Sequence, residues 1–242
     1  MKQQKKKWKT LFWVFLSILT AMIVFYFLNL QALRQVNRNT AASFLKQIGL
    51  CIYIYCDKNG SFPEFFSEDK QIETWSWRVL VASTFSSSQE SEQIQYQHPW
   101  DSNHNAGILK CLSKQYNSYF SSRKQDQKSG LASYVAVKGK GTVWTETNLG
   151  NILEPIKSHP DMIVAIELPY SKNFWAEPGD DITPEEVIEL FQKDGGLVYC
   201  SKQSIFSRDH WPKYFLTLNG QVHSFGSIKS VEELEKLLII SE

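Results

Sequence analysis

A segment near the middle of the chain holds the residues best suited to bind a metal ion. His98, Asp101 and His104 recur at every third position, and two imidazoles with one carboxylate suit Zn²⁺. The alternative is structural, because a Pro-Trp pair after His98 fixes a turn and Asp101 or Ser102 can cap a following helix. We favour the cap, expect no dedicated metal or cofactor site, and keep the three residues only as weak candidate ligands.

Two further stretches have residues that could bind ions. Glu177, Asp180 and Asp181 form an acidic loop that could hold Ca²⁺. A helix that begins within residues 183–186 explains the same acids equally well through its positive N-terminal end. Residues 139–142 read Gly-Lys-Gly-Thr, but they lack the preceding glycine spacing of a phosphate-binding loop. A turn that ends a strand is the better interpretation of that stretch.

Nucleophilic catalysis would require Ser or Cys, a histidine and an acid within reach of one another. The sequence contains neither a GxSxG elbow nor an HExxH motif. Asp209, His210 and Glu167 could meet in space, as could many unrelated groups. We therefore predict that the protein is not an enzyme, and we assign no catalytic residue.

The four cysteines show no CxxC pairing. Cys51 and Cys56 are five residues apart in a predicted helix, so their side chains point in different directions and do not favour a bridge. Cys111 and Cys200 could form a disulfide in an oxidising compartment. We prefer single buried thiols for these positions, because unpaired cysteine is among the most often buried residue types.

These candidates all follow an apolar run that organises the chain. Residues 11–30 read LFWVFLSILTAMIVFYFLNL, with no ionisable side chain other than Tyr26. About twenty helical residues span the ~30 Å hydrocarbon core of a bilayer, so we predict a transmembrane helix. Residues 1–10 form a basic tail, whose five lysines favour a cytoplasmic N-terminus and an exported domain.

A cleaved secretory signal is the alternative interpretation of this region. Such signals have a shorter apolar core, and small residues mark their cleavage site. Here the bulky Leu30 stands at the outer small position. We therefore expect an uncleaved signal anchor in the cytoplasmic (inner) membrane, with a single pass, the N-terminus inside, and the C-terminal domain in the periplasm or outside.

The predicted helix continues past the membrane through residues 31–57. This stretch contains no proline, and Phe44, Ile48 and Ile52 belong to an apolar stripe at helical spacing. We expect that stripe to pack on the following domain. The Asn-Gly pair at residues 59–60 then ends the helix.

Residues 58–242 are long enough for one domain with a sizeable core. The whole chain has 26 basic and 25 acidic residues, a balance that gives no reason to expect nucleic-acid binding. Strong capping boxes begin at Thr183 and Ser230, and Asn219-Gly220 is typical of a two-residue type I′ hairpin. The periodicity predicts helices at 77–85, 105–116, 183–193 and 230–240, and strands at 133–137, 162–168, 197–200, 214–218 and 221–225. The expected fold class is therefore α+β.

Five short motifs carry a resemblance to a known family. They are residues 45–49 (Leu-Lys-Gln-Ile-Gly) with 60–63 (Gly-Ser-Phe-Pro); 76–80 (Ser-Trp-Arg-Val-Leu); 99–102 (Pro-Trp-Asp-Ser) with 104–105 (His-Asn); 133–137 (Ser-Tyr-Val-Ala-Val) through 141–142 (Gly-Thr); and Trp175 with Glu177, Pro178 and Asp180. In this order the chain resembles the bacterial pilin-like family DUF fifteen-fifty-nine, whose members resemble the major pseudopilin of type II secretion. The resemblance implies a long N-terminal helix whose second half packs across an antiparallel sheet, with peripheral helices.

The chain also departs from that family. Members often begin with a prepilin peptidase site, which is a Gly before the apolar run and a Glu at its fifth position. This sequence has no Gly before residues 11–30 and no Glu within them. The departure argues against processing and for weaker self-assembly than in a filament-forming pilin.

Two hypotheses about function follow from the sequence. The first is a non-enzymatic, membrane-anchored pilin-like protein with a structural or interaction role in the cell envelope. Its partners would be the bilayer and, through the N-terminal helix, other copies of itself or other pilin-like proteins. The second is a signal-anchored exported binding module or enzyme that uses the helix only as a tether. A domain that faces the cytoplasm would overturn both hypotheses.

Overall fold

The computed structural model describes residues 2–63, 65–66, 73–85, 91–120, 129–146, 157–168, 173–179, 181–193 and 214–240. By internal contacts the chain divides into two compact units, residues 1–40 and residues 41–242. Helix α1 (Lys2–Asn59) contributes to both units. The N-terminal unit consists of the first part of α1, and the C-terminal unit contains the strands and the remaining helices.

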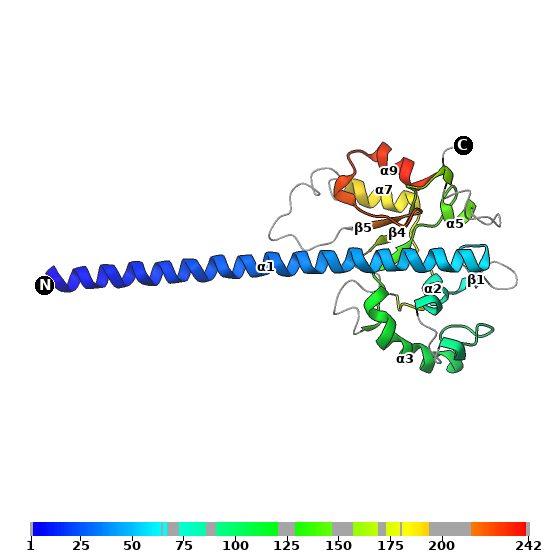
Figure 1. Ribbon diagram of the computed structural model, residues 1–242, viewed down its shortest axis with the longest axis horizontal. Coiled ribbons are helices and arrows are strands. Elements are labelled where there is room, and N and C mark those ends of the chain that lie inside the picture. Colours follow the sequence, from blue (N-terminus) through cyan, green and yellow to red (C-terminus); the bar gives the residue numbers. More distant parts are fainter. Residues whose placement is uncertain are drawn as a thin grey trace. The chain divides into compact units, whose positions relative to one another are not determined.

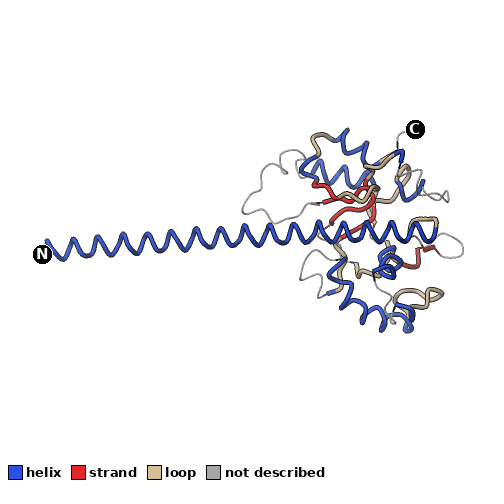
Figure 2. Tube along the Cα trace, viewed as in Figure 1, coloured by secondary structure: helices blue, strands red, loops and turns tan. Residues whose placement is uncertain are grey.

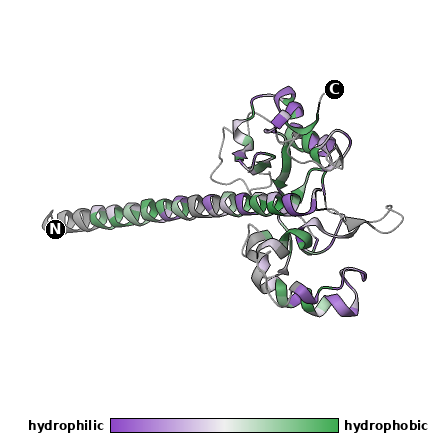
Figure 3. Cartoon of the chain, turned by 45° about the vertical axis from the view of Figure 1, so that its right-hand side comes forward, coloured by the Kyte–Doolittle hydropathy of each residue, from purple (hydrophilic) through white to green (hydrophobic). Residues whose placement is uncertain are grey.

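The N-terminal part of α1 carries a segment long and apolar enough to cross a membrane. This segment is Phe12–Ala32, and none of it is buried inside the protein; its apolar residues are green in Figure 3. Three of its polar side chains donate hydrogen bonds to backbone carbonyls of the preceding turn: Ser17 Oγ to Val14, Thr20 Oγ1 to Leu16, and Asn29 Nδ2 to Phe25, each at 2.8 Å. These bonds lower the cost of placing polar groups in hydrocarbon.

The C-terminal unit is built on a four-stranded antiparallel sheet. Its strands follow one another in chain order and are drawn in red in Figure 2: β3 (Tyr134–Ala136), β4 (Ile163–Glu167), β5 (Tyr214–Thr217) and β6 (Val222–Ser224). Pairs such as Val135 with Ile166 and Leu216 with Val222 set the register. The predicted α+β class and four of the five predicted strands are confirmed. The fifth, at residues 197–200, lies outside the described residues.

The turn between β5 and β6 differs from the predicted type I′ hairpin. The Gly220 amide donates to the Thr217 carbonyl at 2.9 Å, so Leu218 and Asn219 are the central residues of the turn. Thr217 N also donates to Gln221 O at 2.9 Å, and Gly220 has a φ of 79°. This is a three-residue loop with glycine in the left-handed position. The Asn-Gly pair is shifted by one place because Asn219 uses its side chain to stabilise the loop.

Alternation along the strands places apolar side chains on both faces of the sheet, because successive residues point to opposite sides. Tyr134, Val164 and Leu216 belong to a core cluster with α1 from Leu45 onward. The same cluster includes residues of α2 (Trp77–Phe85) and α3 (Asn103–Phe120). The opposite face, with Val135, Ile163 and Phe215, belongs to a second cluster.

Two amphipathic helices cover that second face. Helices α7 (Pro184–Lys193) and α9 (Val231–Leu238) supply Val187, Phe191 and Leu234 to the second cluster. Figure 1 shows them beside strands β4 and β5, with α2 and α3 in the other part of the unit. The sheet is therefore covered by helices on both faces, and little of its apolar surface remains exposed to water.

The C-terminal part of α1 packs on the first face of the sheet, as the apolar stripe predicted. Ile48 is fully buried and Ile52 is 5% exposed, whereas Phe44 is half-buried. The Tyr134 hydroxyl on β3 donates to the Ala41 carbonyl at 3.1 Å. Gly60 follows the last helical residue with a φ of 74°, and its amide donates to the Cys56 carbonyl at 2.7 Å. The predicted glycine stop is thus confirmed.

The N-termini of the other helices lie close to the positions predicted from the sequence, and their C-termini differ more. Thr183 and Glu186 form a reciprocal capping box, with bonds of 2.9 and 3.3 Å, and Ser230 caps α9 through the Glu233 amide. Helix α3 is longer than the predicted 105–116, because its buried stripe continues to Phe120. Helix α9 ends two residues early, since the Ile240 amide donates to the Gly141 carbonyl instead.

Several short elements complete the described structure. Strands β1 (Phe65–Phe66) and β2 (Glu73–Trp75) form a separate two-stranded sheet that the sequence analysis did not predict. Two 3₁₀ turns, η1 (Ser91–Gln93) and η2 (Phe225–Ser227), and the short helix α5 (Val143–Glu146) lie in the connections. These elements are too short for periodicity to identify them.

Candidate functional site

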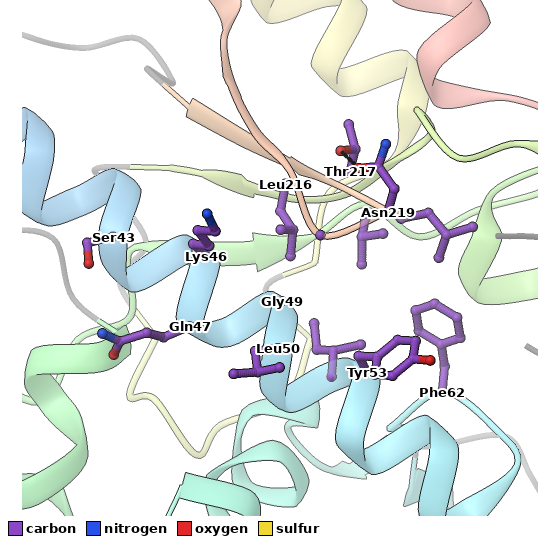
Figure 4. Close-up of a pocket in the computed structure, with 14 residues that line it drawn as sticks. Ser43, Lys46, Gln47, Gly49, Leu50, Tyr53, Phe62, Leu216, Thr217 and Asn219 are labelled. Carbon is purple, nitrogen blue, oxygen red and sulfur yellow. Dashed lines mark hydrogen bonds between the residues drawn. The ribbon is translucent and has the colours of Figure 1, made fainter.

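The described part of the C-terminal unit has a pocket of about 560 Å³ between α1 and the β5–β6 hairpin. One wall comes from α1 between Ser43 and Tyr53, and the other comes from β5 and its turn between Leu216 and Gly220. Phe62, just after α1, and Val164 on β4 complete the lining. Figure 4 shows the Leu216 side chain directed from the strand toward the helix.

The close approach of helix and strand at this pocket depends on Gly49. A Cβ atom at Gly49 would lie 2.7 Å from Leu216 Cδ1, well inside the normal contact distance. Leu216 is 1% exposed and so has little room to move away. The absence of a side chain at Gly49 therefore allows α1 to lie close to β5, and the pocket lies beside this contact.

The pocket wall is mainly apolar, with polar groups concentrated on α1. Phe62, Leu218 and Ile52 are buried at 4%, 8% and 5% exposure, so the wall is packed from behind by the core. Lys46 is the only side chain with a full charge among the described residues that line the pocket. It is exposed, and it takes part in no salt bridge among the described residues.

Asn219 lines the pocket but is held by the turn. Its Oδ1 accepts hydrogen bonds from Thr217 Oγ1 at 2.7 Å and from the Gln221 amide at 3.0 Å. Its Nδ2 donates to Asp161 Oδ1 at 3.1 Å. Asn219 is therefore a structural residue that fixes the hairpin side of the pocket.

The three weak candidate metal ligands come only partly together. The rings of His98 and His104 stack with centroids 4.7 Å apart and planes at 18°. Asp101 is exposed, and among the described residues no group of three His, Cys, Asp or Glu side chains is placed to share a metal ion. The Asn105 amide also donates to Ser102 Oγ at 3.4 Å, which supports the capping interpretation for Ser102.

The loop that carries His98 is organised by Asn105, whose importance was not predicted from the sequence. Its buried side chain accepts from the Gln95 amide at 3.0 Å and donates to the carbonyls of Gln95, His98 and Pro99 at 3.0, 3.2 and 3.0 Å. A buried asparagine with bonds to four backbone groups fixes a loop without any ion. An asparagine inside a helix, just after a loop, is the available sequence signal.

Two of the three acids in the acidic loop accept hydrogen bonds within the fold. Asp181 Oδ1 accepts from Trp77 Nε1 at 3.2 Å and from the Ala136 amide at 3.1 Å, and Oδ2 pairs with Lys138 Nζ at 2.7 Å. Glu177 Oε2 accepts from the Phe174 amide at 3.1 Å. Asp181 thus ties α2 to β3 and to Lys138, two residues beyond the strand, and both of its carboxylate oxygens have partners. Asp180 lies outside the described residues.

The turn at residues 139–142 agrees with its prediction. Gly139 and Gly141 have φ values of 152° and 78°. The Thr142 amide and hydroxyl both donate to the Gly139 carbonyl, at 3.1 and 2.8 Å. The segment follows β3 and closes on itself, so it is a turn at the end of a strand.

Helix α2 contains a fully buried arginine between two residues of the first core cluster, Trp77 and Val79. Arg78 Nε donates to the Tyr134 carbonyl at 2.9 Å, and Nη1 donates to Ser76 Oγ at 2.8 Å. Its guanidinium carbon lies 5.3 Å from the centroid of the Trp77 ring. Trp77 is itself buried, whereas Trp100 is half-buried and stacks on Phe174 with ring centroids 5.9 Å apart.

The acid considered for catalysis is part of the sheet. Glu167 is 4% exposed and pairs in register with Tyr134 on the neighbouring strand. Burial, and secondarily the nearby Glu167 charge, raise the pKa of Tyr134 well above its usual value. Asp209 and His210 lie outside the described residues, so the constellation considered from the sequence stays untested.

The described cysteines carry free thiols in two kinds of surroundings. Burial raises the pKa of Cys56 to about 12 and also raises that of Cys51. Both thiols are therefore protonated and unreactive at neutral pH. Cys111, predicted to be buried, is exposed on α3, because it lies away from the stripe that contains Leu109 and Leu112. Cys200 lies outside the described residues.

Comparison with known proteins identified no related protein or family. No family model matches the sequence, and neither a curated protein nor a solved structure matches the chain. The resemblance to the pilin-like family therefore rests on the five motifs alone. The function has to be argued from the geometry of the chain itself.

Proposed function

We propose that this chain is a non-enzymatic, membrane-anchored, pilin-like protein with a structural or interaction role in the cell envelope. The observation that carries this proposal is the composition of α1, a single helix with two kinds of surface. Phe12–Ala32 is apolar and unburied, whereas the helix from Ala41 onward contributes a stripe to the domain core. A helix with these two parts is what a tethered pilin-like domain requires.

Anchoring in a bilayer is supported by the length of the apolar segment. Its 21 residues correspond to about 31 Å of helix, which matches the hydrocarbon thickness of a typical membrane. Exposed side chains such as Phe15 and Phe25, at 65% and 69% exposure, are unfavourable in water and favourable in lipid. The segment is thereby suited to lipid on all sides.

The proposed orientation places the basic tail in the cytoplasm and residues 41–242 outside it. The five lysines of residues 1–10 supply the charge bias for this arrangement. Protease treatment of spheroplasts, followed by intact-mass measurement of the purified membrane protein, tests it. We expect cleavage of the domain in intact spheroplasts and an uncleaved N-terminus. Protection of the domain, or a mass short by the first thirty residues, would contradict the proposal.

Helix-mediated assembly within the bilayer is the proposed interaction. Ser17, Thr20 and Ala21 are small residues on one face of the segment, where a second backbone could approach. Because the Ser17 and Thr20 hydroxyls donate within the helix, packing rather than hydrogen bonding would hold such a contact. Without an intramembrane Glu, assembly should be weaker than in a filament-forming pilin, as for a minor subunit.

Crosslinking in native membranes tests this assembly. We expect the wild-type chain to form oligomers, and the Ser17→Leu, Ala21→Leu double variant to form fewer of them. A Phe15→Leu, Phe25→Leu variant controls for altered lipid contacts outside the small-residue face. If the wild type forms no larger species, or the double variant crosslinks equally well, the face is not an assembly surface.

The pocket favours a second candidate, in which the protein is a tethered binding module. A concave apolar site of about 560 Å³ falls within the size range of small-molecule sites. In that case the helix serves only to hold the domain at the membrane, and a chain cut between the two units would keep its binding activity. Binding measured before and after such a cut distinguishes the tether from an assembly element.

A further inference from the structure

We propose that the pocket between α1 and the β5–β6 hairpin binds a fatty acid, with its aliphatic chain inside the pocket and its carboxylate at Lys46. This inference goes beyond the assembly role, and it depends neither on the orientation of the chain in the membrane nor on helix-mediated contacts. Three observations support it. They are the order of polar and apolar side chains along α1, the burial of the apolar side chains that line the pocket, and the pairing of both edges of strand β5.

The pocket has its charged side chain toward one end, and the other end is mainly apolar apart from Asn219, whose side chain is bonded within its own turn. Ser43, Lys46 and Gln47 are spaced i, i+3 and i+4 on α1 and all line it, so they share one helix face. Leu50 and Tyr53 continue the same face with apolar groups. Lys46 and Tyr53 are about 10 Å apart along the helix axis. In Figure 4, Lys46 lies toward one end, and Tyr53 and Phe62 lie toward the other.

This polarity matches an amphiphile with one charged end. An ammonium group beside two neutral polar side chains can hold a carboxylate through charge-assisted hydrogen bonds. No aspartate or glutamate is among the described residues that line the pocket, so an anionic head meets no like charge there. A cationic amphiphile would instead meet Lys46. Charge complementarity thus selects the anion.

The apolar end is preformed. Phe62, Leu216 and Leu218 are each less than 10% exposed, and the core packs behind them. Such a wall has little freedom to collapse into the pocket, so the space is available to a ligand without a large rearrangement. Burial of an aliphatic chain there is favourable because it removes apolar surface from water.

The backbone around the pocket favours an aliphatic chain over an extended peptide. Strand β5 is paired with β4 on one side and with β6 on the other, so it has no free edge to which a peptide could add as a strand. The backbone of α1 is likewise bonded within the helix. Only side chains are offered to a ligand, and an aliphatic chain needs no backbone partner.

Photolabelling with a dodecanoic acid that carries a diazirine in mid-chain tests the proposal. The full-length chain in phosphatidylcholine nanodiscs would be labelled, digested and mapped by mass spectrometry. We expect label on peptides that contain Leu50, Tyr53 or Leu218. Unlabelled dodecanoate should displace it, and dodecyltrimethylammonium, with the same chain and the opposite charge, should not.

Two variants separate the charge from the apolar end. Lys46→Glu should lower labelling of the pocket peptides about tenfold or more, because it replaces an attraction by a repulsion. Lys110→Glu, an exposed lysine on α3, is the matched control and should label like the wild type. Leu50→Trp, at a position that is 60% exposed, should block the apolar end and remove the label. Unchanged melting temperatures show that each variant is folded.

Three results would overturn the proposal. They are label confined to Phe12–Ala32, equal displacement by the cationic amphiphile, and undiminished pocket labelling in folded Lys46→Glu. Label confined to the membrane segment would mean that the probe partitions into lipid and leaves the pocket empty. None of these results bears on spheroplast proteolysis or crosslinking, so failure here is distinguishable from failure of the proposed function.

Discussion

The two parts of α1 have similar backbones and opposite surroundings. In Phe12–Ala32 apolar side chains point in every direction, and Phe25 is 69% exposed. From Ala41 onward one stripe is buried, with Leu45 and Ile48 at 0%, while Leu50 on the other side is 60% exposed. A helix with apolar residues all round is suited to lipid, and a helix with one apolar stripe is suited to packing on a domain. One continuous helix can therefore satisfy two environments if its pattern changes along its length.

The largest expected effect comes from removing core volume in the second part. Ile48→Ala should cost about 2–5 kcal/mol of unfolding free energy, because it leaves a cavity at a fully buried position. Urea unfolding of the full-length chain in detergent, followed by tryptophan fluorescence, measures the change. Ile54→Ala on the same helix is the control, since Ile54 is 42% exposed. Equal stability of both variants would mean that the stripe does not pack on the domain.

A charge in the first part should affect the membrane and spare the fold. Met22→Arg, near the centre of Phe12–Ala32, should disfavour insertion by about 2.5–3.5 kcal/mol. Extraction of membranes at alkaline pH should release more of this variant than of a Met22→Leu control. The urea midpoint of the domain should stay the same. Full retention of the arginine variant in membranes would argue against a lipid-spanning segment.

The buried thiol of the second part should make the domain sensitive to alkali. The pKa of Cys56 is about 12 when folded and near its ordinary value of about 8.5 when unfolded. Between these values the unfolded state has lost the proton and the folded state has kept it. Stability is therefore complete below about pH 8.5 and falls as pH rises, by about 1.4 kcal/mol per pH unit for this group.

Unfolding at several pH values between 8 and 11 measures that slope in the wild type and in Cys56→Ala. The variant should lose stability less steeply with pH, although it should be less stable at neutral pH because of the cavity. Tyr96, whose pKa burial raises to about 12, leaves a residual slope in both proteins. Identical slopes would show that Cys56 is not buried against the domain.

The smallest effect is expected for Gly49→Ala, a substitution that tests the contact between α1 and β5. Gly49→Ala gains about 1 kcal/mol of helix propensity but places a methyl group against Leu216, an overpacking that costs about 1–3 kcal/mol. The net change should be between zero and about 2 kcal/mol of destabilisation. Gly107→Ala on α3 is the control, because a Cβ there meets nothing within 4 Å. If both variants are equally stabilised, α1 and β5 are not in close contact.

Local patterns predicted the elements that local physics determines. The stop after Asn59, the N-terminus of α7 and the span of α2 each depend on neighbouring residues, and each agrees with the sequence. The hairpin turn was misassigned because the Asn219 side chain, rather than a positive backbone angle alone, organises it. Short elements such as β1 and β2 leave no periodic signal.

The candidate site could not be predicted from local sequence patterns, because it depends on contacts between residues that are far apart in the sequence. Gly49 is an isolated glycine within a helical pattern, but its contact Leu216 is far from it in the sequence. Asp181 likewise accepts a hydrogen bond from Trp77, which is separated from it by 104 positions. Such pairings are properties of the folded topology. A single sequence shows that a glycine is unusual in a helix, and it does not show what replaces the missing side chain.

The pairing of Gly49 with Leu216 also constrains how the protein is made. The ribosome produces the stripe of α1 long before the β5–β6 hairpin. Until the hairpin is made, the apolar surface around Ile48 lacks the part of its cover that Leu216 and Leu218 supply. The packing of the domain on α1 therefore cannot be completed before the hairpin is synthesised, and part of the stripe stays exposed until then. A chaperone or the translocation machinery has its longest opportunity to hold this protein at the stripe that later becomes its core.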